Sequence, residues 1–252
     1  MEAGKSIRLF KFAGIAVAIW GLMTAADIVA MSSHQRLVPW LSLLCGFSFL
    51  GFCMTSYLRH PHRSTQVLAL VGMGCSLIFF TGPGFESQLL GAVFSIIRSG
   101  LVLVGFAAML HFLLLFPEPG SFSGSSRKTR ALYVPAFLFW LLLSYRALFP
   151  SETETVLDTF AYVMTGLIMT GYLLGGLIVF LRRYIRTAKE LRGSNGLRLM
   201  LWGSLVGFMP ALIGFLPALS SVPGTDTYFI SLAILPLVWS RAIAMAWVEK
   251  YS

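Results

Sequence analysis

The amino-acid sequence predicts an all-α fold, a polytopic integral membrane bundle of eight transmembrane helices. Two observations support this prediction. Hydrophobic residues make up 57% of the 252 residues and charged residues only 12%, whereas a soluble globular domain has about 25% charged residues. The hydrophobic residues also gather in separate runs. Most of these runs reach or approach the roughly 20 residues that a helix needs to cross a bilayer core.

The expected spans occupy most of the chain, so we expect one transmembrane domain over residues 1–252 with only short loops outside the lipid. Pro61 stops the helix of the second span, and Pro117 stops that of the fourth. The third span is the shortest, because the Gly-Pro-Gly turn at 82–84 ends it. In chain order, the spans are expected at about 9–31, 38–57, 66–81, 88–116, 131–149, 158–181, 199–219 and 228–247.

The later spans are bounded by polar segments and contain prolines. A stretch rich in Ser and Gly at 121–126 precedes the fifth span. The sixth helix can extend through Arg192 as a basic segment, before the turn at 193–196. The seventh and eighth spans contain prolines that kink a membrane helix without stopping it, namely Pro210, Pro217 and Pro236.

Lysine and arginine are concentrated in alternate loops. They occur at both termini, at 59–63, at 127–130 and at 182–198, whereas the opposite loops have only Arg36 and Arg146. Positively charged loops stay in the cytoplasm. Both termini are therefore predicted to be cytoplasmic, and the protein is predicted to be a multi-pass protein of the cell inner (cytoplasmic) membrane of a bacterium. An even number of spans also requires the termini to share a side.

The net charge of +9 is explained by this topology and not by nucleic-acid binding, because no basic patch with interleaved aromatic residues is present. The most basic segment is expected to contact anionic lipid headgroups or an acidic partner. The residues expected to make this contact are Arg182, Arg183, Arg186, Lys189 and Arg192.

Charged residues inside a membrane are costly and therefore informative. Asp27 and Arg98 both lie in the outer half of their spans, and we expect them to approach each other directly or through one water molecule. A buried packing pair, or an Arg98 side chain that extends outward to the headgroups, would account for them structurally. The functional alternative is a ligand or anion site open to the outer face.

His111 and Arg241 lie at comparable depth near the inner end of their spans and are candidates for ligand binding or for packing. A membrane histidine can ligate haem or a metal, but haem with two axial histidines needs a second imidazole at this depth. The others, His34, His60 and His62, are in loops. We therefore expect His111 to hydrogen-bond a neighbouring helix, and we expect no metal and no cofactor.

Glycines at four-residue spacing predict close helix contacts in the sixth and seventh spans. Gly171 and Gly175 form one such pair, and Gly203 and Gly207 form the other. Small residues at this spacing let two backbones approach closely. Packing between spans of the same chain and a dimer interface both fit this pattern.

One motif is more specific than composition. Residues 111–119 read His-Phe-Leu-Leu-Leu-Phe-Pro-Glu-Pro and are followed by a basic loop and by Tyr-Val-Pro at 133–135. Together with Trp-Gly at 202–203 and Leu-Pro-Leu at 235–237, this resembles the N-terminal membrane region of bacterial sensor histidine kinases of the competence and quorum-sensing type. The family tends to have an aromatic residue where Arg241 stands. The resemblance implies the membrane scaffold without the kinase module.

No catalytic constellation is apparent, since the sequence lacks nucleophile, zinc and phosphate-loop motifs and has a single carboxylate inside the membrane, the others being in loops, in the termini or at span ends. We expect a non-enzymatic protein without catalytic residues. Two roles fit equally: a ligand-sensing module that acts through a separate signalling partner, and an accessory subunit that binds other membrane proteins. A small-molecule transporter, or an intramembrane enzyme with an unrecognised site, is the remaining alternative.

Overall fold

The computed structural model describes the backbone of residues 2–30, 37–80, 85, 87–116, 126–150, 156–194, 196–214 and 231–251, and these residues contain helices and no strand. Eight of the helices overlap the segments predicted as spans, while α5 and α8 are short connecting pieces. The helices are α1 Glu2–Ala30, α2 Leu37–Arg59, α3 Arg63–Phe79, α4 Gln88–Leu115, α5 Ser126–Ala131, α6 Val134–Leu148, α7 Val156–Arg186, α8 Leu191–Ser194, α9 Leu197–Gly214 and α10 Ile234–Tyr251.

Five segments of these helices are long and apolar enough to cross a membrane, and three shorter apolar helices accompany them. The five are Ser6–Ala30, Leu37–Arg59, Gln88–Leu115, Thr129–Leu148 and Thr159–Arg186. Large apolar side chains on the outside agree with a lipid environment, since Phe12 is 72% exposed and Leu44 is 64% exposed, and a soluble monomer rarely exposes such a surface. The chain is therefore a multi-pass helical membrane protein.

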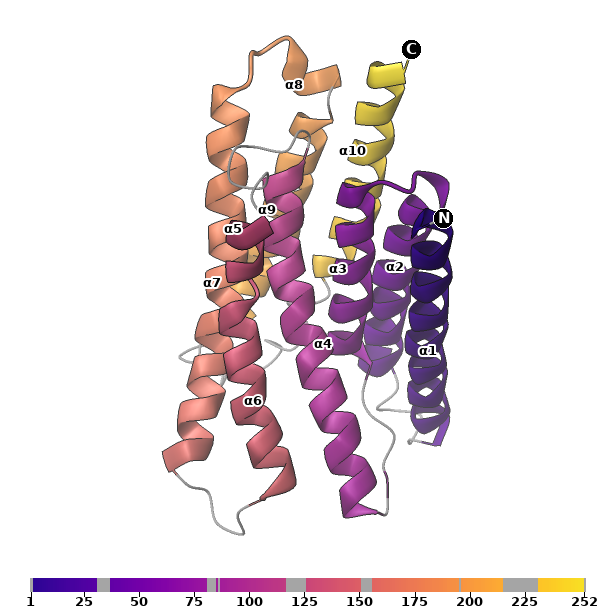
Figure 1. The fold of residues 1–252 in the computed structure, drawn as a ribbon, viewed down its shortest axis with the longest axis vertical. Coiled ribbons are helices and arrows are strands. Elements are labelled where there is room, and N and C mark those ends of the chain that lie inside the picture. Colours follow the sequence, from indigo (N-terminus) through magenta and orange to yellow (C-terminus); the bar gives the residue numbers. More distant parts are fainter. Residues whose placement is uncertain are drawn as a thin grey trace.

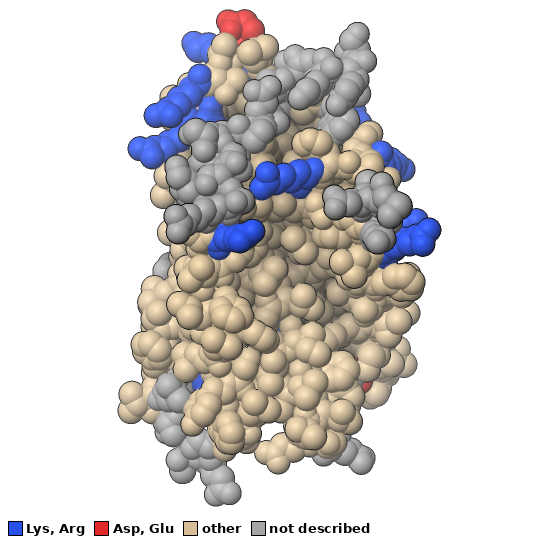
Figure 2. Space-filling view, in the orientation of Figure 1, with Lys and Arg blue, Asp and Glu red and all other residues tan. Residues whose placement is uncertain are grey.

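The helices run up and down the bundle, and the two termini lie toward the same end (Figure 1). Consecutive helices α1 to α4 pack side by side, and α4 also contacts α6 and α7. The last helix, α10, packs against both α9 and α2, so it lies between the late and the early part of the chain. Figure 2 shows Lys and Arg gathered at the end that holds the termini, above a broad surface of uncharged residues.

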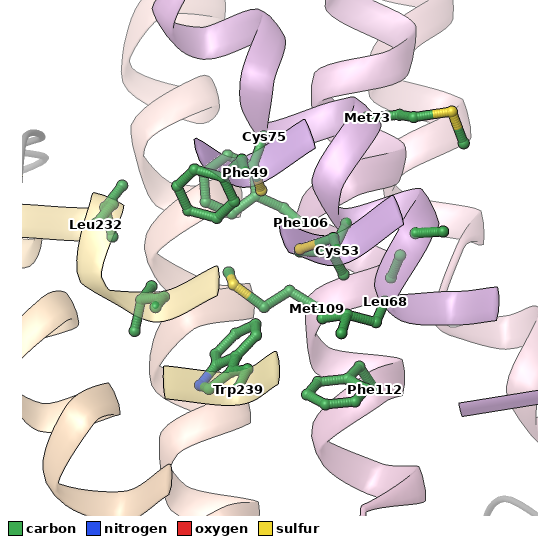
Figure 3. Packing of buried hydrophobic residues seen from close by; sticks show 14 of the residues in the cluster. Phe49, Cys53, Leu68, Met73, Cys75, Phe106, Met109, Phe112, Leu232 and Trp239 are labelled. Atoms are coloured by element: carbon green, nitrogen blue, oxygen red, sulfur yellow. The ribbon is translucent and has the colours of Figure 1, made fainter. Parts of the chain in front are cut away.

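The core forms where α2, α3, α4 and α10 meet (Figure 3). Phe49, Phe106 and Phe112 are at most 1% exposed, and Trp239 is fully buried. The Trp239 ring lies 5.3 Å from that of Phe112, and its indole Nε1 donates to the Ser204 hydroxyl at 3.0 Å. This bond satisfies the polar atom of the largest buried side chain, as a dry core requires.

Glycine brings α3 and α4 into backbone contact. A Cβ atom on Gly74 would lie 2.5 Å from the Cα of Gly105, and one on Gly105 would lie 2.8 Å from the Cα of Gly74. Any side chain at either position would separate the two helices. This crossing fixes α4 at the centre of the bundle.

Two predictions about helix ends are wrong. α7 stops at Arg186 and does not extend through Arg192, because the Arg192 guanidinium donates to the carbonyls of Ile185 and Thr187 at 3.0 and 2.9 Å and so caps the helix. Pro236 lies in the first turn of α10. Backbone N–H groups in a first turn have no partner within the helix, so a proline there breaks no helical hydrogen bond and is not an internal kink. Pro210 is inside α9 as predicted, whereas Pro217 lies outside the described residues.

Candidate functional site

A cavity of about 560 Å³ lies between α2 and α10. This volume falls within the range of roughly 300–1,000 Å³ that is usual for small-molecule sites. Both helices contribute apolar and polar side chains. The cavity is lined by Phe47, Ser48, Gly51, Phe52, Thr55, Ser56, Arg59, His60, Leu237, Ser240, Arg241, Ile243 and Ala244.

Helical spacing places these residues on facing surfaces. Residues 48, 52, 55 and 59 of α2 recur every three or four positions, and so do residues 237, 240 and 244 of α10. Side chains at this spacing share one face of a helix. The sequence therefore builds the cavity from one stripe on each helix, and the stripes meet because α10 packs on α2.

Hydroxyl groups join the two helices at the cavity wall. The Ser56 and Ser240 hydroxyl oxygens lie 2.5 Å apart, and each is 2.9 Å from the carbonyl oxygen of Phe52. Two hydroxyl protons serve these three contacts, so neither hydroxyl has a proton left for a ligand. The Thr55 hydroxyl is also committed, because it donates to the Gly51 carbonyl at 2.6 Å.

The cavity is polar toward one end. Ser56 and Ser240 lie at one level, and both helices run from there toward the end that holds the termini. With a rise of about 1.5 Å per residue, Arg59 lies about 4.5 Å and Arg241 about 1.5 Å beyond that level. Two arginines from neighbouring helices thus line the same part of the cavity.

Neither arginine is neutralised by a residue that the structure describes. Arg59 and Arg241 are both exposed, and within the described chain neither guanidinium has a hydrogen-bond or ion-pair partner. No acidic residue is among those that line the cavity. Arg59 also lies in the last turn of α2, where a cation is favoured by the helix dipole. The arrangement can bind an anion.

Sequence analysis placed His111 and Arg241 at comparable depth in the membrane, but the structure places them in different parts of the bundle. Arg241 lines the cavity, whereas His111 belongs to the contact between α4 and the start of α6. His111 is 5% exposed, and its Nδ1 lies 3.0 Å from the Tyr133 hydroxyl. The Tyr133 ring stands edge-on to the imidazole. The expected hydrogen bond to a neighbouring helix is therefore confirmed, while Nε2 is buried without a partner in the described chain.

The direct ion pair between Asp27 and Arg98 is not formed among the described residues. Arg98 donates from Nε to the Leu77 carbonyl at 3.0 Å and from a terminal nitrogen to the Ile78 carbonyl at 3.5 Å. These carbonyls belong to the last turn of α3, which lacks partners within its own helix. Arg98 therefore caps α3, which α4 packs against. A contact with Asp27 through one water molecule stays a prediction.

The basic segment 182–192 divides into two groups. Arg182, Arg186 and Lys189 are exposed and remain candidates for contact with lipid or a partner. Arg183 instead donates to the carbonyl of Phe116 at 2.6 Å and so caps α4, and Arg192 caps α7. The side chains of Arg183 and Arg192 donate to backbone carbonyls, because the carbonyls in the last turn of a helix have no donor within that helix.

The two predicted glycine pairs also differ. A Cβ atom on Gly203 would lie 2.8 Å from the Cβ of Val238, and one on Gly207 would lie 2.7 Å from the Cγ of Leu235, so this pair packs against α10. Gly171 and Gly175 have no atom within 4 Å of such a Cβ. Packing within the chain is therefore confirmed for α9 and wrong for α7, and a dimer interface at α7 stays a prediction.

The His-Pro-His turn at residues 60–62, between α2 and α3, has a structural role. The Nδ1 of His62 accepts a hydrogen bond from the Ser64 amide at 3.4 Å, and the Thr65 hydroxyl accepts one from the His62 amide at 3.0 Å, which together cap α3. No group of three His, Cys, Asp or Glu among the described residues could hold a metal.

Sequence analysis missed most of the cavity. It named Arg241 but not Arg59, Thr55 or Ser240. The available signal was a polar stripe at helical spacing, running from Ser48 through Thr55 to Arg59 along an otherwise apolar span. Its partner helix could not be identified from spacing alone. Comparison with known proteins adds no further indication, because no protein-family model, curated protein or solved structure matches the chain.

Proposed function

We propose that this protein is a non-enzymatic membrane module that senses a ligand bound in the cavity between α2 and α10. One observation carries the proposal: a cavity of ligand size is lined by two arginines, Arg59 and Arg241, that no group among the described residues neutralises. A ligand held there would touch two helices far apart in the sequence. It could therefore change how α10 packs on α2 and α9.

The topology that we propose has eight spans, with both termini on the cytoplasmic side of the inner membrane. The positive-inside rule supports it, because Lys and Arg gather at the end of the bundle that holds the termini (Figure 2). The cavity arginines then lie near the cytoplasmic surface. The resemblance to the membrane regions of sensor histidine kinases is consistent with this role, in which a separate protein would carry the signal.

The second candidate function is that of an accessory subunit in a membrane complex. The exposed side of α7 favours it, because Gly171 and Gly175 leave an open surface on which another helix could pack closely. Neither candidate requires chemistry by this chain. The two functions predict different molecules bound to the purified protein.

Native mass spectrometry of the full chain, purified in a mild detergent, separates the two functions. We expect a bound small molecule on the wild type. Gly51→Leu should remove it, because Gly51 lines the cavity, and a Cβ atom added there would meet no atom within 4 Å, which leaves the leucine side chain to occupy cavity space. Gly91→Leu is the matched control, since Gly91 also has open space but lies in α4.

Retention of the molecule by the Gly51→Leu variant would contradict the cavity as the ligand site. A stable set of protein partners, with no bound small molecule on the wild type, would support the accessory subunit instead.

A further inference from the structure

We infer that the ligand of the α2–α10 cavity is an anionic membrane phospholipid, with its phosphate between Arg59 and Arg241 and an acyl chain along Gly51, Phe52 and Leu237. This inference rests on the proposed function and specifies the chemistry of its ligand. It follows from the donors, the charge and the opening of the cavity.

The donors select a phosphate. The hydroxyl protons of Thr55, Ser56 and Ser240 are already given to backbone carbonyls or to each other. The guanidinium groups of Arg59 and Arg241 therefore remain as strong donors without a protein partner in the described chain. A guanidinium presents its N–H groups as a planar fork that matches two phosphate oxygens at once.

The charge selects against a zwitterionic lipid. The cavity lining contains two arginines and no carboxylate. The ammonium group of phosphatidylethanolamine would find no acceptor with a negative charge there and would lie near two cations. Phosphatidylglycerol brings the phosphate without that repulsion. Discrimination between lipids therefore comes from an unfavourable contact as well as a favourable one.

The opening of the cavity selects a lipid over free phosphate. Phe52 is 41% exposed and Leu237 is 50% exposed, so the apolar part of the cavity opens to the outer surface of the bundle, toward the middle of the membrane. Free phosphate would leave this apolar part unfilled. An acyl chain from the surrounding bilayer would cover it by van der Waals packing, because the chain passes from one apolar environment to another.

The test measures lipid retention by the full chain with native mass spectrometry in detergent. Dioleoyl-phosphatidylglycerol and dioleoyl-phosphatidylethanolamine are titrated separately. We expect the wild type to retain phosphatidylglycerol at least about tenfold more tightly, which is the effect of one charge-assisted hydrogen bond. Arg59→Gln with Arg241→Gln should abolish this preference. Each single Gln variant should reduce it, which keeps the test informative where the double variant does not fold.

Two controls distinguish binding at a specific site from general attraction of an anionic lipid to positive charge. Arg182→Gln with Arg186→Gln removes the same charge from exposed positions on α7 and should leave the preference unchanged. Arg59→Lys with Arg241→Lys keeps the charge but loses the fork, and should weaken retention only in part. An equal loss in the α7 control would overturn the inference, as would displacement of the lipid by millimolar inorganic phosphate.

The two proposals can fail separately. A ligand that is lost in Gly51→Leu but shows no preference for an anionic headgroup would refute the phospholipid and leave the proposed ligand site intact. Binding that is insensitive to Gly51→Leu would refute the site itself.

Discussion

Two glycine pairs with the same spacing have opposite surroundings in this protein. Gly203 and Gly207 of α9 are buried against Val238 and Leu235 of α10, whereas Gly171 and Gly175 of α7 have open space where a side chain would be. The neighbouring Gly176 is the α7 glycine that packs, since a Cβ there would lie 2.7 Å from a methyl carbon of Leu113. Four-residue spacing thus identifies a face of a helix. Whether another helix covers that face depends on the rotation of the helix in the bundle.

The largest effect is expected from Gly203→Leu. The new side chain would overlap Val238, whose β-branched side chain has little freedom to turn away. We expect the free energy of unfolding to fall by about 3 kcal/mol or more. Denaturant unfolding in detergent micelles, followed by circular dichroism, measures this. Wild-type stability of the variant would show that α9 and α10 are not packed as described.

A second, smaller effect should appear when the space is restored. Val238→Ala in the Gly203→Leu background should recover part of the loss, on the order of 1 kcal/mol, because the two side chains compete for one volume. The same Val238→Ala change combined with Gly171→Leu should be additive. Additivity in both combinations would rule out direct contact between positions 203 and 238.

A third change tests the polar contact beside this glycine pair. Trp239→Phe keeps an aromatic ring in the core but removes the 3.0 Å bond from Nε1 to the Ser204 hydroxyl. We expect a loss of about 1 kcal/mol in the free energy of unfolding. Trp239→Phe combined with Ser204→Ala should lose little more, since the hydroxyl has already lost its partner. A full additional loss would indicate that Ser204 has another role.

The smallest effect is expected from Gly171→Leu. The position is exposed and open, so the stability of the monomer should change by no more than about 0.5 kcal/mol. The same variant also tests the predicted dimer interface on α7. Size-exclusion chromatography with light scattering should give the same mass for the wild type and the Gly171→Leu variant if this face is covered only by lipid. A lower mass for the variant would support the dimer.

Hydropathy was sufficient to predict the positions of the helices, because lipid requires long apolar runs and turns require Pro, Gly or charge. It could not predict which side of each helix faces inward. Phe12 and Phe49 are both membrane phenylalanines, yet the first is 72% exposed and the second 1%. In a soluble protein the exposed face would be polar and would reveal the rotation. In lipid, both faces are apolar.

The same limit explains the outcome for the candidate residues. His111 was placed correctly, because a buried imidazole needs a hydrogen-bond partner wherever it lies. The direct partners of Arg98 were not predicted, because the helix-end carbonyls of Leu77 and Ile78 cannot be distinguished in a sequence from any others. The cavity was missed because Ser240 and Phe52 are 188 positions apart. Local patterns contain no information about such a pairing.

That distant pairing has a consequence for how the protein is made. α2 is synthesised long before α10, so the side of α2 with Ser56 and Arg59 faces lipid or other protein until α10 has been made. Trp239 likewise reaches the core after its ring neighbours Phe112 and Phe208. Contacts between the beginning and the end of a chain are slow to form and leave incomplete intermediates exposed. Arrival of α10 is therefore a step that both the core and the cavity require, and a chain interrupted before it would lack both.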